Sequence, residues 1–502
     1  MEQSISTTDD QVKIANFTQQ HQHNVDPEIN QPLNDNDGHT TKGQSIEPST
    51  YSQLSEWIEI SKQHIRLSAP IVLSNLCRYI LITTDLVFLS RYSTQQDQGV
   101  LYLDGSGISD LYIQSTWWFF MGLIWGMDSC VSQIVGSNIS PDDKKRKLNI
   151  ILYNQLFILT MAAIPVIVIW LLTEPILLLV GADSSVAHYS GIFSRYLIIG
   201  LLPVHWFRTI IKWLEGQAIT DPLLYITILM VPVNIVLNYI FIYALELGYI
   251  GSPLATSVTR WCNLLLILLY LMMWKSSLLV YSYHQLDNNW DEFLTILRYD
   301  LHSSMMIGLE MFAIQSSGLV SLLFDQYVMA AFSISMSIIS LLSAFGRGLT
   351  GGGIPIIGFH LGRSELIADK SIRVINYILI NVAVIVSLVA LSVIILRSWI
   401  ISLFTDNQQV IGLLDHMLLF ASLVILLDGI QNILGGILRA IKRPDLGSKF
   451  FLTTLMMLGL PTSFLLSLYT PLSWYGIWIG LSSGLTGFIV LSIGYLYWFH
   501  IY

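Results

Sequence analysis

Apolar runs of about twenty residues recur along the chain, and they constrain its fold more than any other feature. As a helix, such a run crosses the roughly 30 Å hydrocarbon core of a bilayer. Because lipid offers no partners to backbone N–H and C=O groups, only helices or closed barrels can span it. Of the 502 residues, 53% are hydrophobic and 12% are charged, against about 25% charged in a typical soluble protein. The sequence therefore predicts an all-α membrane protein.

About twelve transmembrane helices are predicted, in two pseudo-symmetric lobes of six. Their expected ranges are 66–90, 110–135, 149–172, 190–210, 223–245, 250–274, 299–324, 328–355, 372–396, 412–438, 448–470 and 473–499. We expect a first lobe at 61–275, a cytoplasmic linker at 276–298 and a second lobe at 299–502. Residues 1–60 hold ten acidic side chains against two lysines and many Gln, Asn and Ser residues, which predicts a disordered cytoplasmic tail.

Basic residues predict the orientation of the helices. The tail end and the even-numbered loops hold 17 Lys and Arg residues, among them Arg208 and Lys212, whereas the odd-numbered loops hold 3, namely Arg91, Arg195 and Arg397. Positively charged loops stay preferentially on the cytoplasmic side of a membrane. Both termini are therefore expected to be cytoplasmic. No apolar segment of a cleavable signal peptide occurs in the first 30 residues, so the first span is expected to direct insertion.

Three pairs of landmarks indicate an internal duplication. Gly136 and Gly358, which end Gln-Ile-Val-Gly and Pro-Ile-Ile-Gly, are 222 positions apart. Pro222 and Pro444 are also 222 positions apart, and Gly251 and Gly476 are 225 apart. Repeated bundles around a central site, which opens alternately to either side, are a common plan of secondary transporters.

Charged side chains inside a span are costly and usually face a cavity or a partner. The clear cases are Arg78, Asp85, Asp128, Arg260, Glu310, Arg347 and Asp428. Asp85 and Glu310 are 225 positions apart, so they occupy equivalent places in the two repeats. Buried carboxylates that exchange a proton for a cation provide the chemistry of an antiporter. The competing hypothesis for Asp85 is a static ion pair with Arg78, although seven residues of helix separate them by about 10 Å.

The other intramembrane charges are less informative. Asp428 precedes Gly429, and Gly435 and Gly436 follow in the same span, so a carboxylate lies near a point where helices can approach closely or bend. Asp128 is expected to be a packing or helix-end residue. Whether Arg78, Arg260 and Arg347 are structural or line a cavity stays open. The three cysteines, Cys77, Cys130 and Cys262, have no metal-ligand spacing, so no metal site or organic cofactor is expected.

Four ordered motifs resemble those of the multidrug and toxic compound extrusion (MATE) family. Asp128-Ser-Cys-Val-Ser-Gln133-Ile-Val-Gly136 is similar to D-T-L-x-S-Q-x-x-G, and Gly358-Phe-His-Leu-Gly362 is similar to V-G-N-x-L-G. Gly435-Gly-Ile-Leu-Arg439 is similar to G-G-V-L-R-G, and the segment from Val233-Asn234 through Asn238 to Gly251 resembles the family's fifth and sixth spans. The resemblance runs from about Arg66 to Phe499.

This resemblance implies export of cationic or amphipathic small molecules, driven by H⁺ or Na⁺, by a monomer in the lipid bilayer. It assigns ion coupling and substrate binding to Asp85, Glu310 and Asp428. Supporting cavity or packing roles fall to Gln133, Asn234, Asn238, Gln315 and Arg347. Glu310 matches the seventh-span glutamate of eukaryotic members, whereas Gln315 replaces a second acid of animal members. A eukaryotic member is expected in the plasma membrane or a vacuolar or endosomal membrane.

Other classes of protein remain as alternatives. A lipid-linked oligosaccharide flippase of the same superfamily would need a strongly cationic cavity, whereas here the span acids balance the span arginines. A polytopic membrane enzyme would need a His/Asp cluster at one interface, and the 11 histidines are scattered. An ATP-driven pump is disfavoured because G-x-x-x-x-G-K-[ST] is absent. A channel would not need matched carboxylates in two lobes. No nucleic-acid partner is expected.

Overall fold

The computed structural model describes residues 50–95, 101–279, 290–321, 323–363 and 368–500. Most of the expected tail, residues 1–49, lies outside these ranges, as do residues 280–289 of the expected linker. The last part of the expected tail is helical, because the first long helix begins at Thr50.

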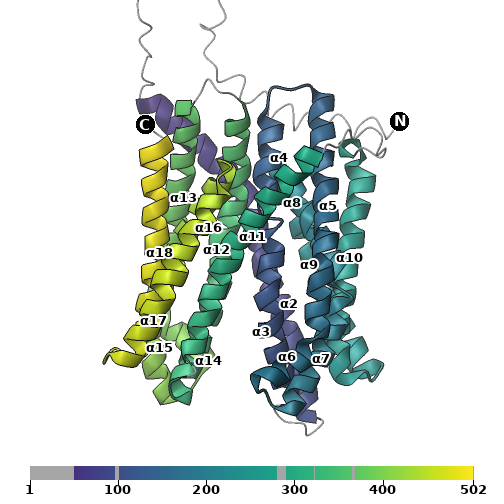
Figure 1. Cartoon of the computed structure of the whole chain (residues 1–502), viewed down its shortest axis with the longest axis vertical. Helices are drawn as coiled ribbons and strands as arrows, with labels where there is room; N and C mark the ends of the chain where they lie inside the picture. Colours follow the sequence, from purple (N-terminus) through teal and green to yellow (C-terminus); the bar gives the residue numbers. More distant parts are fainter. Residues whose placement is uncertain (1–49, 96–100, 280–289, 322, 364–367, 501–502) are drawn as a thin grey trace, which may run out of the picture.

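Long helices run side by side in two groups (Figure 1). The first group contains α2 (Thr50–Gln95), α3 (Leu101–Gly122), α4 (Met127–Gly136), α5 (Pro141–Leu171), α7 (Ser184–Ile198), α8 (Leu201–Gly216), α9 (Asp221–Tyr239) and α10 (Gly251–Trp274). The second contains α11 (Trp290–Ser321), α12 (Gln326–Arg363), α13 (Ala368–Ile395), α15 (Gln408–Ala440), α16 (Pro444–Phe451), α17 (Leu460–Tyr469) and α18 (Tyr475–Tyr495). We call these groups the first and the second lobe. The all-α fold is thus confirmed.

Ten of the described helices are long and apolar enough to cross a membrane, judged by length and composition. An eleventh span results if α7 and α8, which meet at a bend of 51°, are taken as one. The remaining long helix is α11, with 32 residues. It carries acidic and basic residues along its first half, which explains why composition alone does not place it among the spans.

Matching irregularities in the two lobes support the internal duplication. The short helices α6 (Thr173–Val180) and α14 (Arg397–Phe404) begin 224 positions apart. Ala218 and Lys442, also 224 positions apart, have φ angles of 61° and 60°, in the left-handed region that side chains rarely adopt. Each residue follows the end of the corresponding helix, α8 or α15, so the same turn is built twice.

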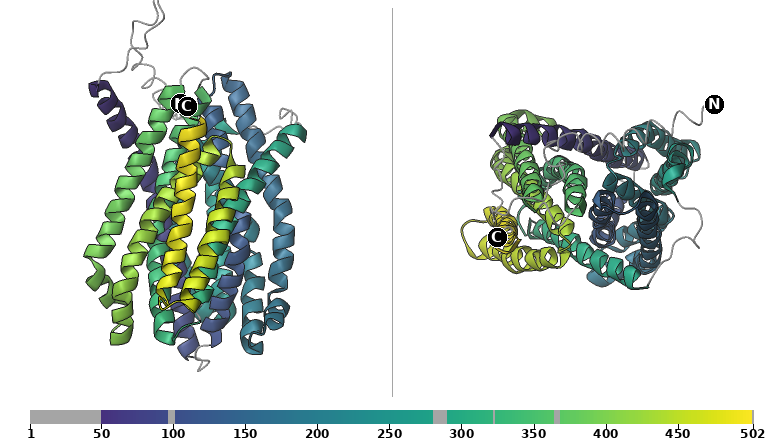
Figure 2. Two further views of the ribbon diagram at one scale, coloured as in Figure 1. Left: turned by 60° about the vertical axis from the view of Figure 1, so that its left-hand side comes forward. Right: turned by 90° about the horizontal axis from the view of Figure 1, so that it is seen from above.

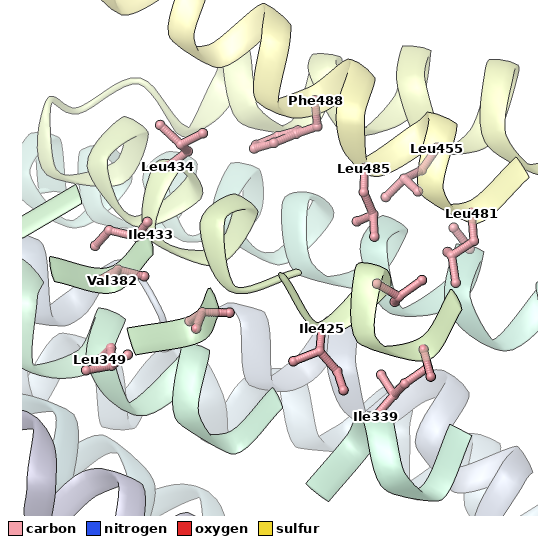
Figure 3. Packing of buried hydrophobic residues seen from close by; sticks show 14 of the residues in the cluster. Ile339, Leu349, Val382, Ile425, Ile433, Leu434, Leu455, Leu481, Leu485 and Phe488 are labelled. Atoms are coloured by element: carbon pink, nitrogen blue, oxygen red, sulfur yellow. The ribbon is translucent and has the colours of Figure 1, made fainter. Parts of the chain in front are cut away.

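Each lobe has its own buried apolar core. In the second lobe, Ile339, Ile425, Leu481 and Phe488 belong to one large cluster of α12, α15 and α18 (Figure 3). The first lobe has two smaller clusters, one around Trp213 and one around Trp170.

Helix α2 connects the two cores. Ile60 and Leu67 near its start belong to the cluster of the second lobe, whereas Ile71, further along, belongs to a cluster of the first. Seen from above, α2 accordingly runs across both groups of helices (Figure 2). At 46 residues it is much longer than the expected first span. The start of α2 thus packs on the core of the second lobe, although the rest of the helix belongs to the first.

Glycines bring the two lobes into backbone contact at one end of the molecule. A Cβ atom at Gly136 in α4 would lie 2.1 Å from the carbonyl oxygen of Phe359 in α12. In the same way, a Cβ atom at Gly362 in α12 would lie 2.1 Å from the carbonyl oxygen of Gln133 in α4. No real side-chain atom tolerates such a distance, so these positions require glycine. The duplicated motifs around Gly136 and Gly358 thus pack against each other across the interface between the lobes.

Candidate functional site

Asp85 is held by neutral side chains of the first lobe. Its Oδ1 accepts a hydrogen bond of 2.7 Å from Asn238 Nδ2 in α9, and its Oδ2 accepts one of 2.7 Å from Thr256 Oγ1 in α10. Arg78 instead donates to Asn75 Oδ1 at 3.2 Å. The structure therefore does not contain the static Asp85–Arg78 ion pair that was the alternative explanation of this aspartate.

A second layer of residues orients this acid. Asn234 donates to Thr259 Oγ1 at 3.3 Å, and Asn238 also donates to the carbonyl oxygen of Asn234, at 3.1 Å. The predicted residues Asp85, Asn234 and Asn238 are thus brought together. Arg260 attracts Asp85 electrostatically. Sequence reasoning missed Thr256, which lies on the next helix, 171 positions from Asp85.

Arg260 has two further neighbours that the sequence alone did not suggest. Its guanidinium carbon lies 5.6 Å from the ring centre of Trp117, in cation–π geometry. It is also attracted by Asp110 in the middle of α3. The cation of Arg260 is therefore balanced by two carboxylates and one aromatic face.

Glu310 and Asp428 form a pair of buried acids in the second lobe. Each is 4% exposed, and the charge of Asp428 acts electrostatically on Glu310. They come from α11 and α15, 118 positions apart. Gln431 interacts with Glu310, while Ser343 and Asn432 interact with Asp428.

Close packing of α12 on α15 places groups around Asp428. A Cβ atom at Gly346 would lie 2.9 Å from the Cα of Gly429, so the two backbones are nearly in contact there. Ser343, about one turn before Gly346 on α12, and Arg347, the residue after it, both act on Asp428. The glycine next to Asp428 thus positions the carboxylate, as the sequence suggested.

One oxygen of each acid lacks a hydrogen-bond partner. Glu310 Oε1 and Asp428 Oδ2 are buried and unpartnered, and among the described residues no basic nitrogen lies within 4 Å of either carboxylate. Two like charges in a low-dielectric site repel strongly, and an unsatisfied buried oxygen costs free energy. This pair is therefore suited to hold a proton, a small cation or the cationic group of a ligand.

The other predicted residues lie in three different places. Arg347 donates to Tyr79 Oη at 3.2 Å and to the carbonyl oxygen of Ser340 at 3.1 Å. Gln315 lines a cavity between α3 and α11, together with Gln114, Met311 and Phe312. Gln133 donates across the lobe interface to the carbonyl oxygen of Ala440 at 2.5 Å. The geometry of Gln133 is that of a packing residue at the interface.

Asp128 lies in the first turn of α4 and is also part of a buried ion-pair network. Lys212 Nζ lies 3.1 Å from Asp128 Oδ2 and 2.8 Å from Glu215 Oε2. Sequence reasoning placed Arg208 and Lys212 in a cytoplasmic loop, which was wrong. Both residues lie within α8, where Lys212 is surrounded by protein. The asymmetry of loop charges is correspondingly weaker than the count suggested.

We expect Lys212→Met to destabilise the protein strongly. The substitution leaves Asp128 and Glu215 buried without their shared cation, and breaking a buried pair in this way costs about 3–5 kcal/mol. The midpoint of thermal unfolding in detergent should fall clearly. Lys449→Met is the matched control, because that side chain is 69% exposed and lies 4.0 Å from Asp445. Equal midpoints for the two variants would contradict a structural role of the network.

No group of three or more His, Cys, Asp or Glu residues in the described ranges could hold a metal ion. The three cysteines are free and partly buried.

A two-lobed helical membrane protein with ionisable side chains inside its spans has the architecture of a secondary transporter. Comparison with known proteins agrees with this class. The MatE family model matches residues 70–240 and 304–465, one stretch in each lobe. The chain belongs to the MATE family of membrane transporters, and the expectation drawn from its motifs is confirmed.

Relatives cover nearly the whole chain. Protein DETOXIFICATION 12 of Arabidopsis thaliana is 25% identical over 447 residues, which is 88% of this chain and 89% of the relative. An uncharacterized transporter of Schizosaccharomyces pombe is 26% identical over 429 residues, covering 83% and 76%. The chain is thus similar to eukaryotic members of the family.

Solved structures share the fold. The crystal structure of the eukaryotic MATE transporter AtDTX14 has a TM-score of 0.79 at 21% identity, covering 88% of this chain and 96% of that one. A MOP superfamily transporter from Pyrococcus furiosus, whose description reports a binding pocket of reverse polarity, has a TM-score of 0.76 at 20% identity, covering 87% and 95%.

Proposed function

We propose that this MATE transporter exports organic cations or amphipathic small molecules by antiport with protons, with Na⁺ as the alternative coupling ion. The observation that carries the proposal is the Glu310–Asp428 pair with its two unpartnered, buried oxygens. A proton and a cationic ligand can neutralise the same pair, and they then compete for it. Such competition is the simplest basis of antiport.

Alternating access is supported by the arrangement of the lobes. Gly136 and Gly362 hold α4 and α12 together at one end, and Gln133 bonds to the end of α15 there. In the proposed orientation, with both termini cytoplasmic, this end faces the cytoplasm. The substrate path would then open to the other side, and transport requires that these contacts separate. A monomer in the plasma membrane or a vacuolar or endosomal membrane suffices for this cycle.

One observation favours the flippase as a second candidate. Arg208 and Arg347 each repel Arg78 electrostatically, so the region around Arg78 is more cationic than the sequence suggested. Arg208 had been assigned to a loop, and the balance of span charges was judged without it. No comparable observation favours a membrane enzyme, and the relatives named above are described as transporters or detoxification proteins.

Transport in proteoliposomes tests the proposal. The purified protein is reconstituted, and uptake or release of a fluorescent organic cation is followed under an imposed pH gradient, under a Na⁺ gradient and under neither. We expect movement against the proton gradient, and its collapse when a protonophore is added. Dye movement that ignores both gradients, across several cations, would count against antiport.

A further inference from the structure

Three arginines from both lobes face one region of the molecule. Arg78 lies in α2, Arg208 in α8 and Arg347 in α12. Arg208 and Arg347 both repel Arg78 electrostatically. Arg347 Nη2 also donates to the hydroxyl of Tyr79, the residue next to Arg78, at 3.2 Å, which places these two arginines at the same level of the α2–α12 contact.

In the described ranges, no carboxylate contacts Arg78, Arg208 or Arg347. Within the described ranges, the salt bridges that form at 4.0 Å or less involve other residues, for example Lys212 with Asp128. The hydrogen-bond acceptors of Arg78 and Arg347 are neutral: the side-chain oxygen of Asn75, the hydroxyl of Tyr79 and the carbonyl of Ser340. A guanidinium carries five N–H donors, so most of them remain available.

All three arginines are half-buried, and Nε of Arg347 is a buried donor without a partner. Elsewhere Lys212 touches two carboxylates, whereas Arg347 is attracted by Glu310 and Asp428, and Arg208 by Glu215, without contact. A cluster of cations inside a membrane protein without contacting acids is costly unless an anion joins it.

We propose that Arg78, Arg208 and Arg347 form a subsite for an anionic group, a carboxylate, sulfonate or phosphate, of an amphipathic substrate. The proposal rests on the proposed transport function and adds to its substrate class amphipathic molecules that carry an anionic group, zwitterions among them. Guanidinium groups bind such oxyanions bidentately, which gives direction as well as charge. Because the arginines come from both lobes, the anion would bridge α2 and α8 to α12.

Arg347 also connects this subsite to the acid pair. It attracts both Glu310 and Asp428, while it repels Arg78. A bound anion would offset the repulsion among the arginines, and the acid pair would retain its place for a proton or for the cationic end of a zwitterion. Two sources provide the anionic group: a soluble organic anion or the head group of an anionic lipid.

Binding in detergent tests the subsite without requiring transport. The probes are a fluorescent naphthyl carboxylate and its neutral amide, which match in size. We expect the carboxylate to bind more tightly, and Arg208→Gln and Arg78→Gln to reduce this preference about tenfold, as for the loss of one charge-assisted hydrogen bond. Arg208→Lys keeps the charge and should retain part of the preference. Equal binding of the two probes, or an unchanged preference in both Gln variants, would overturn the proposal.

The control variant is Arg195→Gln. That side chain pairs with Glu174 at 2.9 Å and is not part of the cluster, so the preference for the carboxylate should stay at the wild-type value. Two Gln variants are used because one of them can fail to fold. Melting midpoints show which variants are folded before the affinities are compared.

Transport assays then identify the source of the anion. Proteoliposomes carry the naphthyl carboxylate in one arm and a fluorescent anionic lipid in the other. If the wild-type protein moves one of these probes and Arg208→Gln does not, the subsite is supported. The probe that moves then identifies the source of the anionic group. If an organic cation is transported while neither anion moves or binds, the subsite is wrong and the proposed function stands. If nothing is transported, the proposed function fails, and the binding preference still decides on the subsite.

Discussion

Glu310→Gln should reduce proton-driven transport of an organic cation to the rate of protein-free liposomes. Glutamine keeps the shape and the contact with Gln431 but can neither release a proton nor carry a negative charge. Asp428 would remain, so the pair would keep only one of the two carboxylates for which the proton and the substrate compete. Uptake driven by a pH gradient is the measurement, with expression and melting midpoint determined in parallel.

Glu292→Gln is the matched control for this prediction. Glu292 lies on the same helix, α11, but it is exposed near the start of the helix. Its substitution should leave transport at the wild-type rate. Retention of proton-driven transport by Glu310→Gln would remove this carboxylate from the coupling path and direct attention to Asp85.

A leucine at Gly136 should stop transport by holding the lobes apart. Even a Cβ atom there would lie 2.1 Å from the carbonyl oxygen of Phe359, and the obstacle is backbone that cannot rotate away. Overpacking of this kind costs about 1–3 kcal/mol, which shifts a two-state equilibrium by roughly 5- to 150-fold away from the closed interface. Each lobe keeps its own core, so the protein should still fold.

Cysteine cross-linking reports this shift directly. Asn138 and Arg363 meet across the interface, where Asn138 Nδ2 donates to the carbonyl oxygen of Arg363 at 2.9 Å. Cysteines at both positions, in a background without Cys77, Cys130 and Cys262, should cross-link readily in the parent and poorly with Gly136→Leu. Gly412→Leu is the control, because nothing lies within 4 Å of a Cβ atom there. Efficient cross-linking and transport in Gly136→Leu would show that the lobes do not need this contact.

The arrangement of the fold followed from local patterns in the sequence. Apolar runs predicted the helices, and three pairs of landmarks predicted the repeat that α6 and α14 reproduce 224 positions apart. Helix α11 is instructive, because the apolar residues at 299–324 predicted a span, whereas the composition of the helix is too polar for the usual criterion. The length of α2 escaped prediction because its polar first turns look like part of the tail.

The contacts of the site depended on distant segments. In the sequence, Lys212 looks like a loop residue because Gly216 follows shortly after it. Its burial is explained by its contact with Asp128, which is 84 positions away. The hydrogen bond from Thr256 to Asp85 spans 171 positions, and the Glu310–Asp428 pair spans 118. The sequence indicated which acids are unusual but not which side chains accompany them. The cluster of Arg78, Arg208 and Arg347 needs three helices in place before it can be recognised.

In the proposed mechanism, a proton and the substrate compete for the Glu310–Asp428 pair. The most direct measurement is the proton release that accompanies substrate binding, followed with a pH indicator in weakly buffered detergent solution. We predict that a saturating organic cation releases protons from the wild-type protein and that Glu310→Gln releases none under the same conditions. Saturable binding to the wild-type protein without any proton release would contradict competition at this pair.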